Sequence, residues 1–342
     1  MKRLIGISAI LAIIGVLVGW YYYSKIFHSI VDLPTSSHFD LFIEPNSDFS
    51  EVVQALESCD CITNMNSFKW VSEQKKYPEL VKPGRYKILP DMTANDLVNK
   101  LRSGDQDAIK VTFTGVRTVA ELCEQVAGQI LLDSAELTLN FYDQDVIKSK
   151  GFNQETFRSM FIPNTYEMWW NSNSEAFVAR MAAEYKKFWT AERVGKAAAL
   201  GLSQSECSTL ASIVKAETAK TDEAPQIAAL YLNRIRIGMA LQADPTLIYA
   251  LGDFSVQRVL DIHKEINSPY NTYRFAGLPP GPINFPEPVY IDAVLNAPSH
   301  NFLYMCAKPD FSGYHNFAQS YNQHLVYARK YQQALDKRGI YK

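Results

Sequence analysis

The chain begins with an uninterrupted apolar run. Leu4 to Tyr23 carry no charge, and a helix of this length rises about 30 Å, the thickness of one bilayer core. Lys2 and Arg3 precede the run, and four aromatic residues from Trp20 onward end it, as at a membrane interface. The run is long for a cleaved signal peptide, and no A-x-A-like site follows it. The pattern therefore predicts a single-pass anchor over residues 1–25, with the N-terminus in the cytoplasm and the remaining chain outside it.

After a short tether, predicted over residues 26–37, the apolar pattern becomes that of strands and amphipathic helices. Alternating apolar residues from Phe39 to Ile43 predict a strand. Asp48 and Thr93 each stand three residues before an acidic residue, which is the spacing of a capping box that opens a helix. Another helix and a second strand, which follows a Pro-Gly turn, complete the order β-α-α-β. We therefore expect a small module over residues 38–107.

Residues 108–342 predict a larger second domain. Its apolar pattern alternates between short strands, long helices and a stretch rich in turns. The longest predicted helices lie around residues 174–190, 203–218 and 320–337, and another begins near Pro225. Strands and helices do not alternate as regular βαβ units, so the pattern indicates an α+β fold.

Composition narrows the class of protein. A chain of 342 residues with 47% hydrophobic and 20% charged residues can bury a sizeable core. The net charge of -2 argues against a nucleic-acid partner, because neutralising phosphates requires an excess of Lys and Arg. The five cysteines and six histidines show no metal-ligand spacing, so we expect no metal. The cysteines are expected to form no disulfide framework and to behave as small buried hydrophobes.

One carboxylate stands where an apolar residue is expected. The apolar positions of the helix around 203–218 recur at spacings of three and four up to Val214, and the next such position is Glu217. Burial and the negative end of the helix dipole both disfavour the ionised form, so this Glu could act as a general acid. The alternative is an ordinary helix-end Glu that lies in solvent or pairs with Lys215 or Lys220.

Other positions carry chemistry less specifically. Asp244 is either a functional carboxylate or simply the N-cap of a helix that has Pro245 at its first position. The aromatic run from Tyr270 to Tyr273 and the GLPPGP loop at 277–282 suit a carbohydrate site, but rigid loop packing explains them equally well. Nothing in the sequence singles out a second carboxylate among Glu167, Asp222 and Glu223. The sequence contains no G-x-S-x-G elbow, P-loop or dinucleotide-binding fingerprint.

Four sequence blocks carry a resemblance to a known family. The chain resembles the YceG-like, or MltG-type, endolytic murein transglycosylases in LASIVKAET, AALYLNRIRIGMALQADPTLIYALG, SPYNTYRFAGLPPGPI and FLYMCAKPDFSGYHNFA. These blocks cover roughly residues 110–340 in the family's order. The preceding module, with its PGRY turn, is similar to the family's LysM-like domain, and a single N-terminal anchor is also the family's layout.

The resemblance implies a cofactor-free lyase that acts on peptidoglycan glycan strands. Such an enzyme cuts the β-1,4 bond between N-acetylmuramic acid and N-acetylglucosamine and leaves a 1,6-anhydro ring. It implies Glu217 as the catalytic residue, with Lys215 where many members carry a second Glu. It also implies substrate contacts, which are Gln242, Asp244, Tyr270, Asn271 and Tyr273. Cell-wall synthases are expected partners, and the cell (inner) membrane, with the catalytic domain on its periplasmic or extracytoplasmic side, is the expected location.

Two other functions remain open from the sequence. The first is a hydrolytic muramidase of similar fold, which would leave a reducing end in place of the anhydro ring. The second is a non-catalytic, membrane-tethered cell-wall-binding protein, in which Glu217 would be a structural acid.

Overall fold

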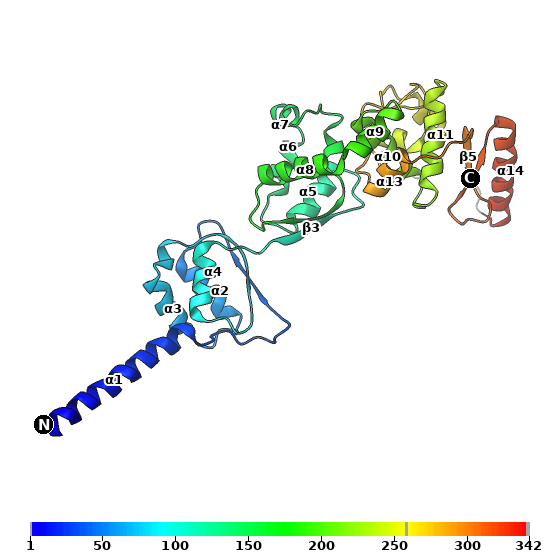
Figure 1. Cartoon of the computed structure of the whole chain (residues 1–342). Coiled ribbons are helices and arrows are strands. Elements are labelled where there is room, and N and C mark those ends of the chain that lie inside the picture. The colour runs from blue at the N-terminus through cyan, green and yellow to red at the C-terminus, as the bar shows by residue number, and fades with distance from the viewer. Residues whose placement is uncertain (1, 257–258, 340–342) are drawn as a thin grey trace. The chain divides into compact units, whose positions relative to one another are not determined.

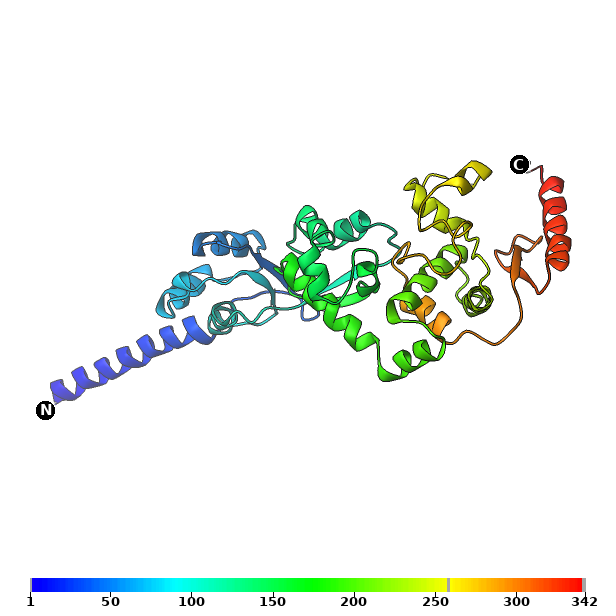
Figure 2. The same ribbon diagram turned by 90° about the horizontal axis from the view of Figure 1, so that it is seen from above.

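The structure, a computed structural model, describes residues 2–256 and 259–339. The chain forms two compact units that mix helices with small sheets (Figures 1 and 2). The first unit takes in the residues up to Val111, together with Gln129–Leu131 and Tyr166–Asn173. The second takes in Thr112–Gly128, Leu132–Thr165 and the residues from Ser174 onward. The expectation of a mixed helical and sheet architecture is thus confirmed.

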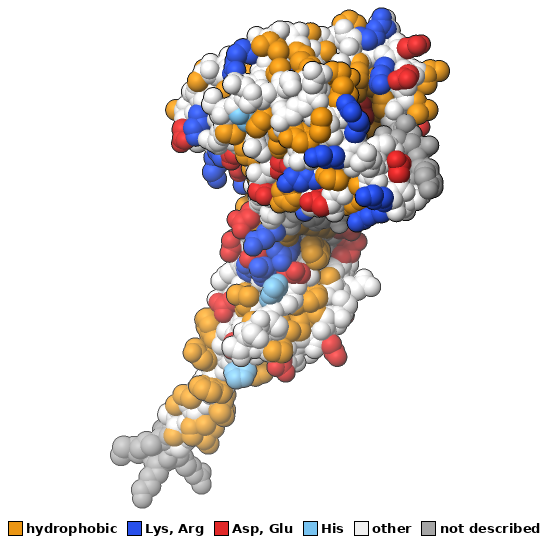
Figure 3. All heavy atoms as spheres, turned by 90° about the vertical axis from the view of Figure 1, so that its right-hand side faces the viewer, with side chains coloured by type: hydrophobic (Ala, Val, Ile, Leu, Met, Phe, Trp, Pro, Cys, Tyr) orange, Lys and Arg blue, Asp and Glu red, His pale blue; other side chains and the backbone are white. Residues whose placement is uncertain are grey.

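The N-terminal apolar run is one helix, α1 (Lys2–Phe27). Its segment Gly6–Phe27 has a mean hydropathy of 1.7 and is not buried by the rest of the protein, so it is long and apolar enough to cross a membrane. Hydrophobic side chains cover this part of the helix (Figure 3). Near its end, Tyr22 packs on Trp70 with ring centroids 5.4 Å apart, and the Lys25 ammonium lies 4.8 Å from the centre of the same indole.

The predicted β-α-α-β order is present in the first unit. Strand β1 (Phe39–Ile43) pairs with β2 (Gly84–Ile88) in an antiparallel register. The helices of this module are α2 (Phe49–Ser58), α3 (Met65–Gln74) and α4 (Ala94–Ser103), with a 3-10 turn at Tyr77–Glu79. Asp48 and Thr93 both form complete capping boxes, as the sequence predicts. The apolar faces of these elements share one core.

Two expectations for this unit need correction. Ile30 and Val31, inside the stretch expected to be a tether, are buried in the module's core, so this part of the connection is folded. Cys59 and Cys61 are joined by a disulfide, so they are not the free buried hydrophobes that the sequence predicts. Cys123 and Cys207 are free and buried, so the interpretation as small buried hydrophobes is correct for these two cysteines.

Strand β3 (Ile109–Phe113) pairs with β4 (Asn164–Met168), and the residues of both strands are divided between the two units. The second unit contains the strand pair of β5 (Tyr304–Ala307) and β6 (His315–Ala318) and most of the helices. Its helices are α5 (Val119–Ala127), α6 (Ser134–Asn140), α7 (Gln144–Ser149), α8 (Ser174–Phe188), α9 (Ala191–Ala199), α10 (Gln204–Glu217), α11 (Ala224–Arg236), α12 (Asp244–Leu251), α13 (Pro288–Leu295) and α14 (Tyr321–Lys337).

Helix α10 is the centre of this unit. It lies beside α11 and α13 (Figure 1) and also packs against α12. Every residue of α10 from Cys207 to Val214 is buried. The helix is therefore enclosed on all sides over two turns, rather than buried along one stripe as its periodicity suggests. The last turn, which carries Glu217, leaves this core only partly.

The GLPPGP loop is part of the packing around α10. All residues of 281–286 are buried, and Ser212 of α10 accepts the N–H of Ile283 at 3.0 Å through Oγ and an amide N–H of Asn284 at 2.8 Å through its carbonyl. Gly281 lies so close to the Glu155 carbonyl that an added Cβ would collide with it. Of the two interpretations of this loop, the structure supports rigid packing.

Candidate active site

Glu217 forms no ion pair with either neighbouring lysine. Lys215 donates instead to Glu287 Oε1 at 2.7 Å and to the Phe285 carbonyl at 2.8 Å. Lys220 lies with its ammonium 5.2 Å from the centre of the Tyr314 ring. The alternative that Glu217 pairs with Lys215 or Lys220 is therefore wrong, because both cations are held elsewhere.

Glu217 is instead bonded to a tyrosine of the next helix. Tyr231 on α11 is 2% exposed, and its hydroxyl donates to Glu217 Oε1 at 2.8 Å. The Glu217 side chain itself is only partly buried, so the carboxyl group is ordered by a neutral donor and still meets solvent. A carboxyl group in this state can exchange a proton with a molecule that approaches from outside.

The surroundings of Glu217 favour its protonated form. Burial raises the pKa of Glu217, and the nearby Asp244 charge adds to the rise. The Tyr231 hydrogen bond and the charges of His315 and Arg234 act in the opposite direction, but they do not cancel the effect of burial. Glu217 therefore holds its proton to higher pH than an ordinary Glu, in the direction that its position on α10 predicts, and this suits a general acid.

Arg234 connects α11 to the elements that flank Glu217. It is buried, and it donates from Nε to the Leu303 carbonyl at 2.7 Å and from Nη1 to the Leu241 carbonyl at 2.5 Å. Leu241 begins the short segment that leads into α12. The guanidinium thus fixes the path of the chain toward Asp244 and contributes positive charge near Glu217.

Asp244 does not cap α12. The N-cap residue is Ala243, and Asp244 already lies in the first helical position, from which its side chain makes no capping bond. The expectation that Asp244 is an N-cap is wrong, because the chain enters the helix one residue earlier. Asp244 is exposed, and Tyr273 donates its hydroxyl to Asp244 Oδ1 at 2.5 Å.

The turn before α12 is held by the aromatic loop. Gln242 adopts a left-handed backbone with φ of 51°, which is unusual for a residue with a side chain, and its side chain is exposed. Its N–H donates to the Thr272 carbonyl at 3.0 Å, and the N–H of Ala243 donates to Thr272 Oγ1 at 3.1 Å. The loop that carries Tyr273 and the start of α12 therefore form one rigid unit.

The remaining residues of the aromatic run have different environments. Asn271 is fully buried and donates to the carbonyls of Lys264 and Ile266, both at 2.8 Å, so it shapes the loop from inside. Tyr270 packs on Tyr249, with ring centroids 4.6 Å apart, and lines a cavity of about 250 Å³. The exposed residues Gln242 and Asp244 and the half-buried Tyr273 are thus brought together, whereas Asn271 and Tyr270 are not part of that group.

The possible second carboxylates are engaged elsewhere. Glu223 is buried and accepts both the backbone N–H and ring Nδ1 of His315, at 2.7 and 2.8 Å. Asp222 accepts the Tyr314 hydroxyl at 2.9 Å. Glu167 is exposed on β4, in the part of the strand that belongs to the first unit. Within residues 2–256 and 259–339, no group of three His, Cys, Asp or Glu side chains is arranged to hold a metal ion.

Sequence reasoning missed three residues that act on Glu217, namely Tyr231, Arg234 and His315. Tyr231 and Arg234 occupy buried positions of α11, where a large side chain suggests core packing. His315 lies on β6, in a block noted only for its resemblance. Their one signal in the sequence was that polar or hydroxyl-bearing residues stand among apolar ones, which does not identify a partner.

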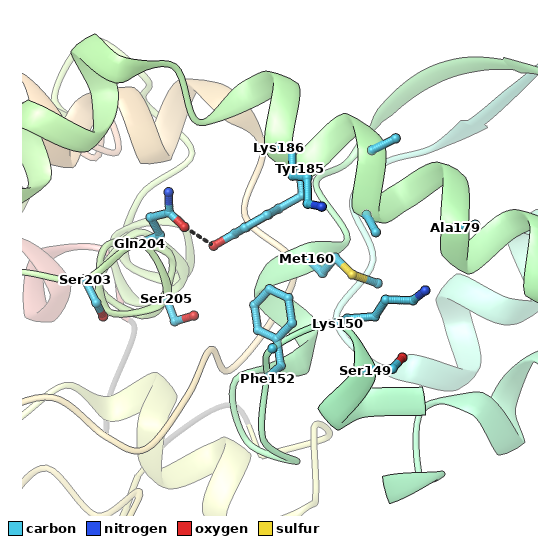
Figure 4. A pocket seen from close by; sticks show the side chains of 13 residues that line it. Ser149, Lys150, Phe152, Met160, Ala179, Tyr185, Lys186, Ser203, Gln204 and Ser205 are labelled. Atoms are coloured by element: carbon cyan, nitrogen blue, oxygen red, sulfur yellow. Dashed lines mark hydrogen bonds between the residues drawn. The ribbon is translucent and has the colours of Figure 1, made fainter. Parts of the chain in front are cut away.

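A larger cavity opens at the opposite end of α10. It has a volume of about 630 Å³ and is lined by residues that include Phe152, Met160 and Tyr185, whose hydroxyl donates to Gln204 Oε1 at 3.3 Å (Figure 4). At 1.5 Å per residue, Gln204 lies roughly 20 Å from Glu217 along the helix. None of the residues that line this cavity is acidic, so it contains no candidate general acid.

Comparisons with known proteins identify the family of this chain. A model of the YceG-like family matches residues 41–330. The endolytic murein transglycosylase of Streptococcus pneumoniae serotype 2 (strain D39) is 26% identical over 322 residues, which cover 84% of this chain and 58% of that protein. The endolytic murein transglycosylase of Bacillus subtilis (strain 168) is 24% identical over 328 residues, which cover 92% of this chain and 90% of that protein. This chain thus spans only 58% of the length of the pneumococcal relative.

A solved structure shares the fold. The crystal structure of a YceG-like protein from Listeria monocytogenes aligns with a TM-score of 0.55 at 23% sequence identity. The alignment covers 85% of this chain and 99% of the other. At this identity the likeness concerns the fold.

Proposed function

Because the chain belongs to the YceG-like family, we propose that it is an endolytic murein transglycosylase with Glu217 as its general acid and then its general base. One observation carries the proposal. Glu217 is a partly buried carboxyl group with a raised pKa, held by Tyr231, beside an exposed group of polar side chains. Gln242, Asp244 and Tyr273 form that group, and we propose that they contact the glycan. Asn271 acts indirectly by shaping the loop.

A single carboxyl group is sufficient for this chemistry. Hydrolytic glycosidases usually need two, because one must activate water or form a covalent intermediate. In a lytic transglycosylase, Glu217 protonates the glycosidic oxygen as the N-acetylglucosamine departs. The resulting carboxylate then takes the proton of the C6 hydroxyl of the muramic acid, which closes onto C1. Because this second step is intramolecular, proximity replaces a bound nucleophile.

We further propose that α1 anchors the enzyme in the membrane, with its N-terminus in the cytoplasm and the residues that follow α1 outside. The length and hydropathy of Gly6–Phe27 support the span, and Lys2 and Arg3 support this orientation. The module at 38–107 is proposed to act as a LysM-like glycan-holding element, on the basis of its β-α-α-β order. Cell-wall synthases that produce the strands are the corresponding proposed partners.

Mass analysis of products from the detergent-solubilised full chain tests this proposal. We expect wild type to release fragments that end in anhydro-muramic acid, and Glu217→Gln to lower that release by about 10²–10⁴-fold. Glu206→Gln on the same helix is the matched control, since Gln also completes a capping box with Ser203. This control should cut like wild type.

Two other results would each refute the proposal in a different way. Products heavier by one water would identify a hydrolytic muramidase. Strands that do not shorten with wild-type protein, but that co-sediment with it, would identify a wall-binding protein. Normal release of anhydro ends by folded Glu217→Gln would remove Glu217 from the chemistry.

A further inference from the structure

We propose that Asp244, held by Tyr273, is a second catalytic residue that accepts a hydrogen bond from the 2-acetamido N–H of the sugar whose bond is cut. This interaction would orient the acetamido oxygen for attack on C1 of the same sugar. The inference rests on the proposed transglycosylase function and assigns Asp244 a specific step in that reaction.

Asp244 has an acceptor available for such a contact. In the first position of α12 its side chain makes no capping bond, and it is exposed. Tyr273 donates to Oδ1 at 2.5 Å, and within the described chain no donor reaches Oδ2. A carboxylate that accepts a hydrogen bond on one oxygen can present its other oxygen to a ligand.

The two side chains are held by backbone contacts on both sides. Thr272 accepts the N–H of Ala243 at 3.1 Å, and its hydroxyl lies 2.8 Å from that of Thr246 in α12. Asn271 Oδ1 accepts the N–H of Tyr273 at 3.0 Å. Asp244 and Tyr273 therefore have little freedom to move, which is the preorganisation that stabilisation of a developing charge requires.

Asp244 and Glu217 lie on helices that pack against each other, α12 and α10. The charge of Asp244 helps to raise the pKa of Glu217. Burial, the hydrogen bond to Asp244 and the charge of Glu217 all raise the pKa of Tyr273, so these three groups lie within electrostatic reach of one another. A proton-holding carboxyl group beside an exposed carboxylate is the division of roles expected for an acid and an electrostatic partner.

The proposed reaction consists of two successive substitutions at C1. The acetamido oxygen donates an electron pair to C1, and the pair of the C1–O4 bond passes to O4, which takes the Glu217 proton. The product is an oxazolinium ring whose N–H is hydrogen-bonded to Asp244. The C6 hydroxyl oxygen then attacks C1, and its proton returns to Glu217. The bond between C1 and the acetamido oxygen of the oxazolinium ring breaks, and its electron pair returns to that oxygen. Asp244 remains a carboxylate throughout and stabilises the positive charge of the intermediate.

A comparison of N-acetylated with N-deacetylated glycan strands tests this assignment through cleavage. We expect Asp244→Asn to cut acetylated strands about 10²-fold more slowly than wild type. Removing the acetyl group should slow wild type strongly and Asp244→Asn hardly further, because both changes remove the same interaction. The matched control is Asp253→Asn, in which the amide oxygen can still accept the Ser255 N–H and hydroxyl. This control should show the wild-type preference for acetylated strands.

Binding of a thiazoline-fused N-acetylhexosamine, a stable analogue of the oxazolinium ring, provides a readout without turnover. We expect calorimetry to show binding by wild type and Asp253→Asn, and about tenfold or greater weakening in Asp244→Asn. Equal losses on deacetylation in wild type and Asp244→Asn would overturn the inference, as would equal affinity for the analogue. Either result, with normal anhydro products from wild type, would leave the transglycosylase function intact. If wild-type protein releases no anhydro ends, the proposed transglycosylase function itself is refuted.

Discussion

The module of the first unit and the surroundings of Glu217 use polar side chains in different ways. In the module, Asp48 and Thr93 bond to backbone three residues away and thereby start helices. Around Glu217, the hydrogen bonds join residues 14 and 29 positions apart, on different elements. Local bonds define an element, whereas bonds between elements place groups against each other at a surface that a ligand can reach.

The module also contains a long-range polar contact, and its character supports the distinction. Arg85 pairs with Asp40 at 2.8 Å across β1 and β2. Both partners belong to one strand pair and satisfy each other, so the contact strengthens the sheet. Asp244 and Glu217, by contrast, are each held by a neutral tyrosine hydroxyl, so neither carboxyl group is paired with a cation.

The largest effect on stability is expected from Lys215, which stands two residues before Glu217 but is held by a partner. Lys215→Met should leave Glu287 without its cation and lower the free energy of unfolding by about 2–3 kcal/mol. Chemical denaturation measures the change. The double variant Lys215→Met with Glu287→Gln should recover much of the loss, since it removes the unpaired charge. A single variant as stable as wild type would show that the pair is not structurally important.

Glu217→Gln should be more stable than wild type at high pH, and this difference in the free energy of unfolding should grow as the pH rises. The raised pKa means that the folded state binds a proton which the unfolded state has already released, so stability falls as pH rises toward the folded pKa. Gln removes this penalty, which is worth about 1.4 kcal/mol for each unit of pKa elevation. Thermal unfolding of both proteins between pH 4 and pH 8 checks the sign. A variant that loses stability relative to wild type at high pH would contradict the raised pKa.

Tyr231→Phe should shift the pH dependence of cleavage with a smaller effect on its maximum. The hydroxyl favours the ionised form of Glu217, so its removal raises the pKa of Glu217 further. Because the acid must begin protonated, the loss of activity on the alkaline side should move to higher pH, with a cost of about 1 kcal/mol for the lost bond. Profiles of kcat/KM against pH and a ¹³C titration of the carboxyl group measure the shift. Movement to lower pH would mean that Tyr231 does not donate to Glu217.

The smallest effect is expected from a cap in the module. Thr93→Ala removes the side-chain bond to the N–H of Asp96 and should cost about 1 kcal/mol of stability in the first unit. Release of anhydro ends per folded molecule should stay at the wild-type rate, because the hydroxyl of Thr93 bonds to Asp96 of its own helix and not to Glu217 or Asp244. Thr93→Ser, which keeps the hydroxyl, is the control. A fall in the cleavage rate that Thr93→Ser does not share would show that the module takes part in catalysis.

Much of the local structure was predictable because it depends on residues within one or two helical turns. Capping boxes marked the starts of α2 and α4, and Gly104, which has a φ of 76°, ends α4 in the left-handed conformation that glycine adopts readily. The spacing of apolar residues placed Glu217 against the core and predicted the direction of its pKa shift. The same local rules failed at Asp244, where a one-residue difference in the helix start turned an expected cap into an exposed carboxylate.

The sequence by itself determined the apolar N-terminal helix, the order of elements in the module and the unusual position of Glu217 on α10. Only the tertiary structure decided that Tyr231 holds Glu217, that Tyr273 holds Asp244, that Lys215 is held by Glu287, and that Cys59 and Cys61 are joined. The reason is physical. Capping and periodicity are set by neighbours along the chain, whereas the partner of a side chain on another element depends on how helices and loops pack, which no local pattern encodes.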